Sequence, residues 1–289
     1  AQTLVVVDDL YRPYRPKRRT RATIAKEKGL EPLANVISLQ MLKTPILEEA
    51  AKYINEEKEV HTAEEALEGA RDIIAEHISD EADYRIRIRD LTVKHGRIVS
   101  AAKDPEAESV YEMYYDFSEP VKYLKHYRCL AINRAEKEGV ISVKIEIDLD
   151  KVTSWLESKI IKNANSFVVD TVKVSIKDSL KRLIIPSIER DIRSEVTSVS
   201  EEKAIETFSS NLYNLLLTRG IKDSNVIGFD PAFRTGCKLA VIDTNGNLLD
   251  IAVIYPHEPK NDKIGSAKTL RELINKYNVK LISIGNGTA

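Results

Sequence analysis

The sequence predicts a mainly α-helical region followed by part of an α/β domain. Two observations support this fold class. In the longer first part, apolar residues recur mostly at intervals of three and four, the period of an α-helix. In the shorter second part, short β-prone runs alternate with turn residues. We therefore expect residues 1–222 to form a helical body with a short β element near residues 140–148, and residues 223–289 to begin a second domain.

The second part shows its strands clearly. A β-prone run that includes Ile227 and Phe229 ends at Asp230-Pro231, because proline cannot continue a hydrogen-bond ladder. Asn245-Gly246 is a strong hairpin signal. We predict three neighbouring strands at residues 226–230, 238–243 and 248–254. A helix at residues 264–277 and a fourth strand at residues 281–284 should follow. This order is typical of the front half of an RNase H-like α/β fold, in which an acid on the first strand faces the site.

Capping residues place helices in the first part. Thr62 opens a capping box ahead of apolar residues at helical spacing. We expect Asp80 to cap the next helix and Gly96 to end it. Three arginines of that helix should lie on its water-facing sides: Arg85, Arg87 and Arg89.

The middle of the chain combines one strand with long helices. Residues 140–148 alternate apolar and polar, which predicts a half-buried strand. Helices are expected at residues 126–138, 149–161 and 167–219. Pro186 interrupts the last of these helices, and Gly220 is expected to end it. An apolar stripe falls at helical spacing near the end of the last one: Ile205, Phe208, Leu212 and Leu215. We expect Trp155 and the stripe at residues 212–217 to be core.

Composition excludes several classes of protein. The formal net charge is −1 and 31% of residues are charged, which argues against a uniformly basic nucleic-acid binder. Cys129 and Cys237 form no CxxC pair or disulfide framework, so we expect a reducing, cytoplasmic compartment. The five histidines lack HxxxH spacing, so no zinc site is predicted. No apolar run approaches membrane-spanning length, so no membrane partner is expected.

The stretch at residues 11–21, YRPYRPKRRTR, is the best candidate for nucleic-acid binding. It contains no acid, and its cations could neutralise phosphates while Tyr11 and Tyr14 stack on bases. The candidate phosphate contacts are Arg12, Arg15, Lys17, Arg18, Arg19 and Arg21. Two alternatives stay open. The stretch could be a solvated loop that packs its tyrosines on the helical body, or its arginines could bind acidic helices of the same protein.

Asp230 is the candidate catalytic and metal-binding residue, with Mg²⁺ as the possible ion. Two-metal phosphoryl chemistry needs a cluster of carboxylates, and only one acid is well placed here. Asn286, beyond the fourth strand, is a poor substitute for a second acid, although Glu272 on the helix could contribute. The alternative is that Asp230 only caps the turn after its strand.

Arg234, Thr235 and Gly236 form a candidate phosphate nest, because a turn rich in N–H groups can hold an anion. Actin-like ATPases begin with a similar strand, acid, turn and strand. They usually carry glycine directly after the acid, where this chain has Pro231 and Ala232, and no Walker motif is present. A plain hairpin turn is the favoured interpretation.

An aromatic group lies in the middle of the sequence and consists of Tyr111, Tyr114, Tyr115 and Phe117. Such a group could be a docking surface, but it is more often a satellite core under a loop. His126 and Cys129 are close in sequence without a third partner, so no catalysis is assigned to them.

Several stretches resemble the Tex family of bacterial transcription accessory proteins. The strongest are DLYRPYRPKRRTRATIAKEKGLEPLA at residues 9–34 and GFDPAFRTGCKLAVID at residues 228–243. Intermediate stretches agree in the expected order: YDFSEP, HYRCLAINRAEKEG, PSIERDIRSEV and the closing IGNGTA. A more distant likeness is to eukaryotic elongation factors that act with RNA polymerase and histones. One departure is Ala232, where the family usually has glycine, which matters only if the backbone needs positive φ or close approach to a ligand.

The resemblance implies a large cytoplasmic protein with a helical region, a YqgF-type RNase H-like domain, helix-hairpin-helix elements and a C-terminal OB-fold RNA-binding domain. This chain would begin inside the helical region and stop midway through the YqgF-type domain. The implied function is a nucleic-acid-binding transcription accessory or elongation factor that acts as a non-catalytic scaffold. Its partners would be RNA or DNA and RNA polymerase. The alternatives are a metal-dependent nuclease that uses Asp230 and a scaffold for protein–protein interaction.

Overall fold

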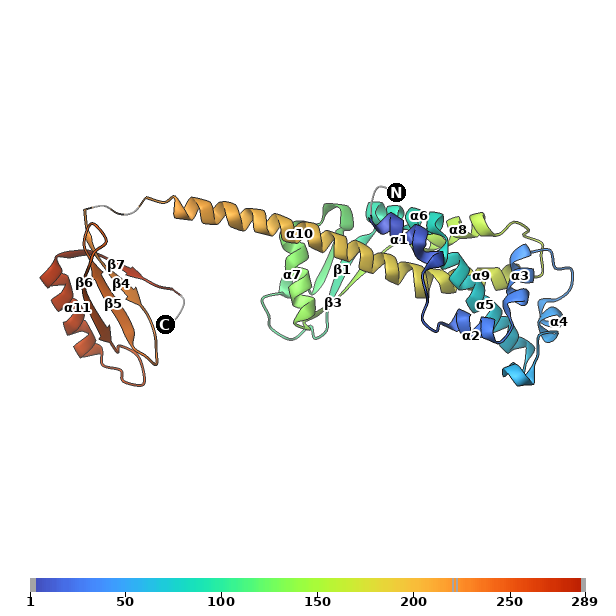
Figure 1. Cartoon of the computed structure of the whole chain (residues 1–289), viewed down its shortest axis with the longest axis horizontal. Coiled ribbons are helices and arrows are strands. Elements are labelled where there is room, and N and C mark those ends of the chain that lie inside the picture. The colour runs from blue at the N-terminus through green and yellow to red at the C-terminus, as the bar shows by residue number, and fades with distance from the viewer. Residues whose placement is uncertain (1–3, 220, 222, 287–289) are drawn as a thin grey trace. The chain divides into compact units, whose positions relative to one another are not determined.

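The computed structural model describes residues 4–219, 221 and 223–286 (Figure 1). The chain forms two compact units, Ala1–Ser210 and Asn211–Ala289. The first unit is mostly helical with one small sheet, and the second contains a sheet with one helix. The predicted fold class, a helical part followed by an α/β part, is confirmed. Gly220, the expected helix stop, lies outside the described residues.

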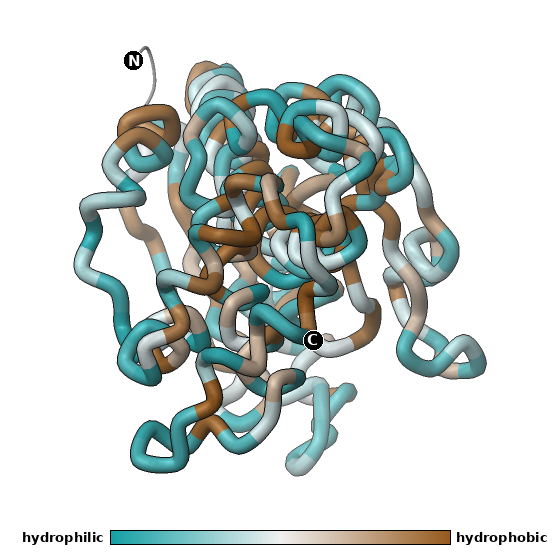
Figure 2. The backbone as a smooth tube through the Cα atoms, turned by 90° about the vertical axis from the view of Figure 1, so that its right-hand side faces the viewer, coloured by the Kyte–Doolittle hydropathy of each residue, from teal (hydrophilic) through white to brown (hydrophobic). Residues whose placement is uncertain are grey.

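Helix α5 (Ala63–Asp80) is the element around which the first unit packs. Thr62 caps it through its hydroxyl, which accepts a hydrogen bond from Glu65 N, as the capping box predicts. Its buried residues recur at helical spacing and belong to the core cluster that the surrounding helices share. Figure 2 shows how apolar and polar residues alternate along the backbone. Those helices are α2 (Arg21–Glu27), α3 (Glu31–Leu39), α4 (Ile46–Ala51) and α9 (Val169–Asp178).

A three-stranded antiparallel sheet lies beside the helices in the order β2-β1-β3. Only β3 (Ile141–Glu146) falls in a stretch predicted as a strand. The other two strands, β1 (Arg97–Ala102) and β2 (Asp116–Pro120), were missed because they are short and weakly alternating. Helix α7 (His126–Lys137) packs on this sheet, and Tyr111 and Tyr114 are buried with it. The interpretation of the aromatic group as a satellite core is therefore confirmed.

Trp155 on α8 (Leu149–Ile160) packs edge-on against Tyr84. A nearly continuous helical run follows α8. It consists of α9, a π-helical stretch (Ser179–Ile184) and α10 (Ile185–Leu216). Pro186 is the second residue of α10, just after the π-helical stretch, where its missing N–H is tolerated. The prediction that the stripe near the end of this run is core was wrong. The large apolar side chains of residues 212–217 are exposed, namely Leu212, Tyr213, Leu215, Leu216 and Leu217, and so are Ile205 and Phe208 before them.

A buried ion cluster holds the N-terminal helix α1 (Leu4–Tyr11) on α6 (Ala82–His95). Asp9 accepts hydrogen bonds from Arg89 and, at 2.5 Å, from Arg85 Nε. Arg85 is 1% exposed and also donates to Ser187 Oγ on α10 at 3.0 Å. The prediction that Arg85 and Arg89 face water was wrong, because their guanidinium groups pair with an acid far away in sequence. Only Arg87 is an exposed member of the three.

Asp80 also differs from expectation. It is the last residue of α5 rather than the cap of α6, and Glu81 lies between the two helices. A carboxylate at a helix C-terminus is unfavourable to the helix dipole. Here Arg12 and Lys17 offset this cost by pairing with Asp80.

The pKa of Asp9 shows which force dominates in the cluster. Burial tends to raise the pKa of this carboxyl, whereas hydrogen bonds and charge interactions with Arg89 and Arg85 lower it. The net pKa of Asp9 lies below its usual range, so the two guanidinium groups outweigh desolvation. Asp9 is therefore charged in the folded protein and stabilises it at neutral pH.

The second unit has a four-stranded sheet in the order β6-β5-β4-β7. The neighbours of β4 are β5, which is antiparallel, and β7, which is parallel. The elements match the predicted order: β4 (Asn225–Asp230), β5 (Cys237–Ile242), β6 (Leu248–Ile254), α11 (Lys263–Tyr277) and β7 (Val279–Ile284). Helix α11 covers one face of the sheet, where Ile227, Leu239 and Val241 are buried with Leu273. No helix within residues 4–219, 221 and 223–286 is both long and apolar enough to cross a bilayer.

Gly69 lets α5 approach the residues that join α2 to α3. A Cβ at this position would lie 2.4 Å from Leu30 Cδ1 and 3.2 Å from Ala25 Cβ. We expect Gly69→Ala to lower the free energy of unfolding by about 1–3 kcal/mol through overpacking. In a Leu30→Ala background the 2.4 Å clash disappears and only the 3.2 Å approach to Ala25 Cβ remains, so the same change should cost less, because the gain in helix propensity of up to about 1 kcal/mol opposes the remaining strain. Urea unfolding of the four proteins checks this, and an equal effect in both backgrounds would contradict it.

The ion cluster makes stability depend on pH. Because the folded pKa of Asp9 is depressed, its contribution is present above the unfolded aspartate pKa of about 3.9 and is lost as pH falls through the folded value. Asp9→Asn leaves the buried Arg85 with only the longer pair to Asp191, at 3.8 Å, so it should cost up to about 3–5 kcal/mol at pH 7. The cost should shrink toward zero near pH 2 in urea unfolding. The exposed neighbour variant Asp8→Asn is the control, and an equal cost for both variants at pH 7 would rule out the cluster's role.

Candidate nucleic-acid interface

The basic segment, defined as residues 12–21, runs from a single 3₁₀ turn (Arg12–Tyr14) to the start of α2. Arg12 Nε lies 3.4 Å from Asp80 Oδ1 at the end of α5. Lys17 Nζ lies 3.2 Å from Glu76 Oε2 and also pairs with Asp80. Arg12 and Lys17 thus bind an acidic helix of the same protein, which was one of the two alternatives for this stretch. They attach the segment to α5.

The remaining cations of the segment are differently placed. Arg15 and Arg18 are exposed and form no ion pair with any residue that the structure describes. Arg19 makes only an exposed pair with Glu27, at 3.6 Å. Beside them the Tyr14 ring is 78% exposed, so it does not pack on the helical body. The segment is therefore fixed at Arg12 and Lys17, with the free Arg15 and the Tyr14 ring between these two points and the free Arg18 directly after the second.

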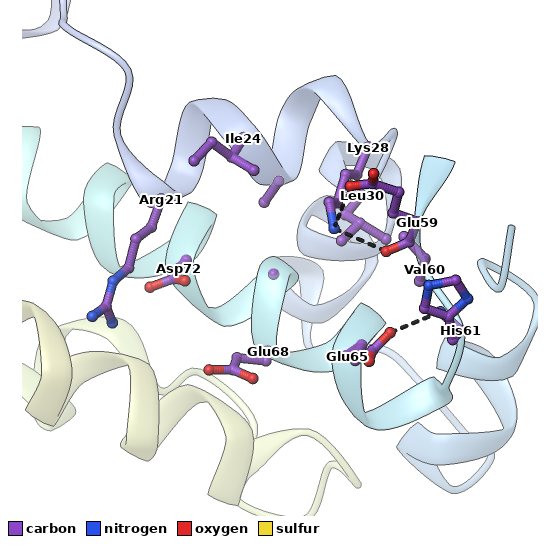
Figure 3. A pocket seen from close by; sticks show the side chains of 12 residues that line it. Arg21, Ile24, Lys28, Leu30, Glu59, Val60, His61, Glu65, Glu68 and Asp72 are labelled. Atoms are coloured by element: carbon purple, nitrogen blue, oxygen red, sulfur yellow. Dashed lines mark hydrogen bonds and ion pairs between the residues drawn. The ribbon is translucent and has the colours of Figure 1, made fainter. Parts of the chain in front are cut away.

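Arg21 belongs to a different environment. It lines an open pocket of about 560 Å³ between α2 and α5, at the same end as Asp72 (Figure 3). The pocket also contains three glutamates, Glu59, Glu65 and Glu68. Desolvation raises the pKa of Asp72, although charge interaction with Arg182 opposes the rise. The carboxylates would repel a phosphate, so Arg21 is the least suited of the six cations to bind one.

Asp230 lies at the exposed end of β4, in register with Lys238 of β5. Because Phe229 and Cys237 face α11, Asp230 and Lys238 point to the opposite side of the sheet. Glu272 on α11 therefore cannot join Asp230. The parallel strand β7 ends alongside β4, where Gly285 N donates to Phe229 O at 2.9 Å, and Asn286 follows at this edge.

The side chains around Asp230 do not fit a magnesium centre. No group of three or more His, Cys, Asp or Glu within the described ranges is arranged to hold a metal ion. A hard cation such as Mg²⁺ needs several oxygen ligands, and two-metal phosphoryl transfer needs more carboxylates still. The described residues do not supply such a cluster at this edge.

The turn at Arg234, Thr235 and Gly236 joins β4 to β5. Gly236 has φ of +77°, and a Cβ there would lie 2.6 Å from a Tyr255 ring carbon and 2.8 Å from Val253 Cγ1. Positive φ and close packing both require glycine at this position. Arg234 and Thr235 are exposed. The phosphate nest stays a prediction, since the geometry is equally that of a packed turn.

Sequence reasoning missed the acid on which the N-terminal helix depends. Asp9 was not singled out, although its role has a signal in the sequence: a helix that carries three arginines in alternate positions needs carboxylates wherever it is buried. The pairing itself joins residues 76 positions apart, so no local pattern could identify the partner.

Comparison with known proteins matches both parts of the chain. Residues 43–208 match the family described as Tex central region-like, and residues 224–289 match the Tex protein YqgF-like domain. The uncharacterized protein YdcI of Bacillus subtilis is 49% identical over 286 residues, which cover 98% of this chain and 40% of that protein.

Two further relatives carry descriptive names. The transcriptional accessory protein Tex of Neisseria gonorrhoeae is 33% identical over 302 residues, or 100% of this chain and 38% of that protein. The S1 RNA-binding domain-containing protein 1 of Homo sapiens is 29% identical over 304 residues, or 100% of this chain and 30% of that protein. The chain thus spans less than half the length of these relatives. The family matches cover most of the sequence in the order that its motifs predict, and the chain belongs to the Tex family.

Proposed function

We propose that this chain is part of a nucleic-acid-binding accessory factor in transcription and that it works as a non-catalytic scaffold. The relatives include proteins named as a transcriptional accessory protein and as an S1 RNA-binding domain-containing protein. By this proposal the partners are RNA or DNA and RNA polymerase, and the protein acts in the cytoplasm, where bacterial transcription takes place.

The observation that carries the proposal is the division of cations in the basic segment. Arg12 and Lys17 pair with Asp80 and therefore hold the segment in place. Arg15 and Arg18 are left without a carboxylate partner among the described residues. A fixed backbone with free guanidinium groups binds phosphates at a smaller entropic cost than a flexible tail would.

The scaffold role is supported by the sheet edge of the second unit. Asp230 has Lys238 as its neighbour in register and lacks a carboxylate cluster within the described part of the chain. A lysine beside the single acid favours phosphate contact over metal-dependent cleavage. The exposed Arg234–Gly236 turn is proposed as a minor phosphate contact of this unit.

Neutralising the free arginines should weaken nucleic-acid binding in a salt-dependent way. We expect Arg15→Ala/Arg18→Ala to lower the slope of log K against log salt by about 1.4 for single strands, since each lost phosphate contact removes about 0.7. Fluorescence anisotropy with labelled single-stranded RNA, single-stranded DNA and duplex DNA measures this slope. Lys151→Ala/Lys203→Ala is the matched control, because it removes two exposed cations that already pair with neighbouring acids.

An unchanged slope for Arg15→Ala/Arg18→Ala would contradict the proposed interface. The same samples, incubated with Mg²⁺ and run on a gel, test the scaffold role, for which we expect intact nucleic acid. Metal-dependent cleavage that Asp230→Asn abolishes would replace the scaffold with a nuclease.

A further inference from the structure

A second basic and aromatic surface lies at the junction of β2 and α7. It is formed by Lys122, Tyr123, Lys125 and Tyr127, here named the 122–127 patch. The Tyr123 ring is 64% exposed and the Tyr127 ring 65% exposed. Lys122 and Lys125 are exposed too. Residues 122–128, KYLKHYR, combine cations with tyrosines, as the basic segment does. Sequence reasoning overlooked this signal for a basic and aromatic surface.

Buried neighbours hold the patch in a fixed conformation. Val121 is buried on one side, and its N–H donates to Gly96 O at 3.0 Å. Cys129 is buried on the other side. Between them the chain forms a 3₁₀ turn (Val121–Tyr123) and then the first turn of α7. The two tyrosines are therefore presented outward by a structured backbone.

The local charge of the patch is positive. Lys122 and Lys125 form no ion pair within the described residues. The nearby carboxylate of Glu119 is already engaged by Arg128, at 2.9 Å, and this interaction raises the pKa of Arg128. Helix α7 has no acid in its first turn and no side-chain cap, so its free N–H groups add positive potential.

Each exposed ring has a cation beside it. Lys122 Nζ lies 5.5 Å from the centroid of the Tyr123 ring, and Arg128 Cζ lies 5.8 Å from that of Tyr127. Arg128 is held by Glu119, whereas Lys122 has no carboxylate partner within the described residues, so a phosphate bound by Lys122 would bring the attached base close to the Tyr123 ring. Base stacking on tyrosine requires an unpaired base, because duplex bases are already stacked on one another.

We propose that the 122–127 patch is a second nucleic-acid contact that selects single strands. Tyr123 and Tyr127 stack on bases, and Lys122 and Lys125 contact the flanking phosphates. A protein partner fits the patch less well, since lysine is depleted from the cores of protein interfaces. The inference rests on the proposed function, which it extends from phosphate contact to base contact.

The test is anisotropy of the whole chain with labelled oligouridylate, oligothymidylate and duplex DNA, each about 15 units long to cover one binding site. We expect Tyr123→Ala/Tyr127→Ala to weaken binding of both single strands about tenfold or more, with an unchanged salt slope and unchanged duplex affinity. Tyr123→Phe/Tyr127→Phe should restore binding, because it keeps the stacking faces. Lys122→Gln/Lys125→Gln should lower the salt slope.

The matched control is Phe208→Ala/Tyr213→Ala, which removes two comparably exposed rings from α10 and should leave binding unchanged. Equal losses on RNA and DNA would support the shared single-strand chemistry, and a loss on RNA alone would support the patch and assign it to RNA. If Arg15→Ala/Arg18→Ala lowers the salt slope while the tyrosine variant binds normally, the patch is refuted and the proposed function stands. Absence of binding by the unmodified chain would overturn both.

Discussion

The buried carboxylate of Asp9 is the interaction on which the proposed interface depends. It pairs with two guanidinium groups of α6, one of them nearly inaccessible to water, and Asp191 supplies the second negative charge. Without that charge the two largely buried guanidinium groups would share a single carboxylate, that of Asp191 on α10. Since the basic segment continues directly from α1, the position of its free arginines follows from this cluster and from the pairs at the end of α5.

The same charge logic separates structural cations from functional ones. Arginines and lysines that meet carboxylates, such as Arg12, Lys17 and Arg85, stabilise the helical unit and are unavailable to a ligand. Cations without a carboxylate partner occur at several places in the described chain, Lys43, Lys103 and Lys238 among them, but on the basic segment and the 122–127 patch they lie beside exposed tyrosines. Near-zero net charge is thus compatible with nucleic-acid binding, because a local group of unpaired cations can attract phosphates whatever the sum of charges over the chain.

Local rules predicted the second unit well and the charged contacts poorly. The hairpin at Asn245-Gly246 and the strand that follows it were predicted closely, because turn chemistry and alternation act between neighbouring residues. The roles of Arg85 and Lys17 depend on acids more than 60 residues away, which no periodicity encodes. The stripe that includes Phe208 and Leu212 shows the complementary limit, since spacing predicts an amphipathic face but does not say what covers it.

The central claim is that nucleic acid contacts the helical unit at two surfaces. Backbone hydrogen exchange of the chain, with and without a single-stranded oligonucleotide, locates those contacts directly. The account predicts slower exchange in residues 11–21 and in the first turn of α7, with little change in the second unit apart from the turn at residues 234–236. Protection confined to the sheet edge around Asp230, with none in the helical unit, would contradict it.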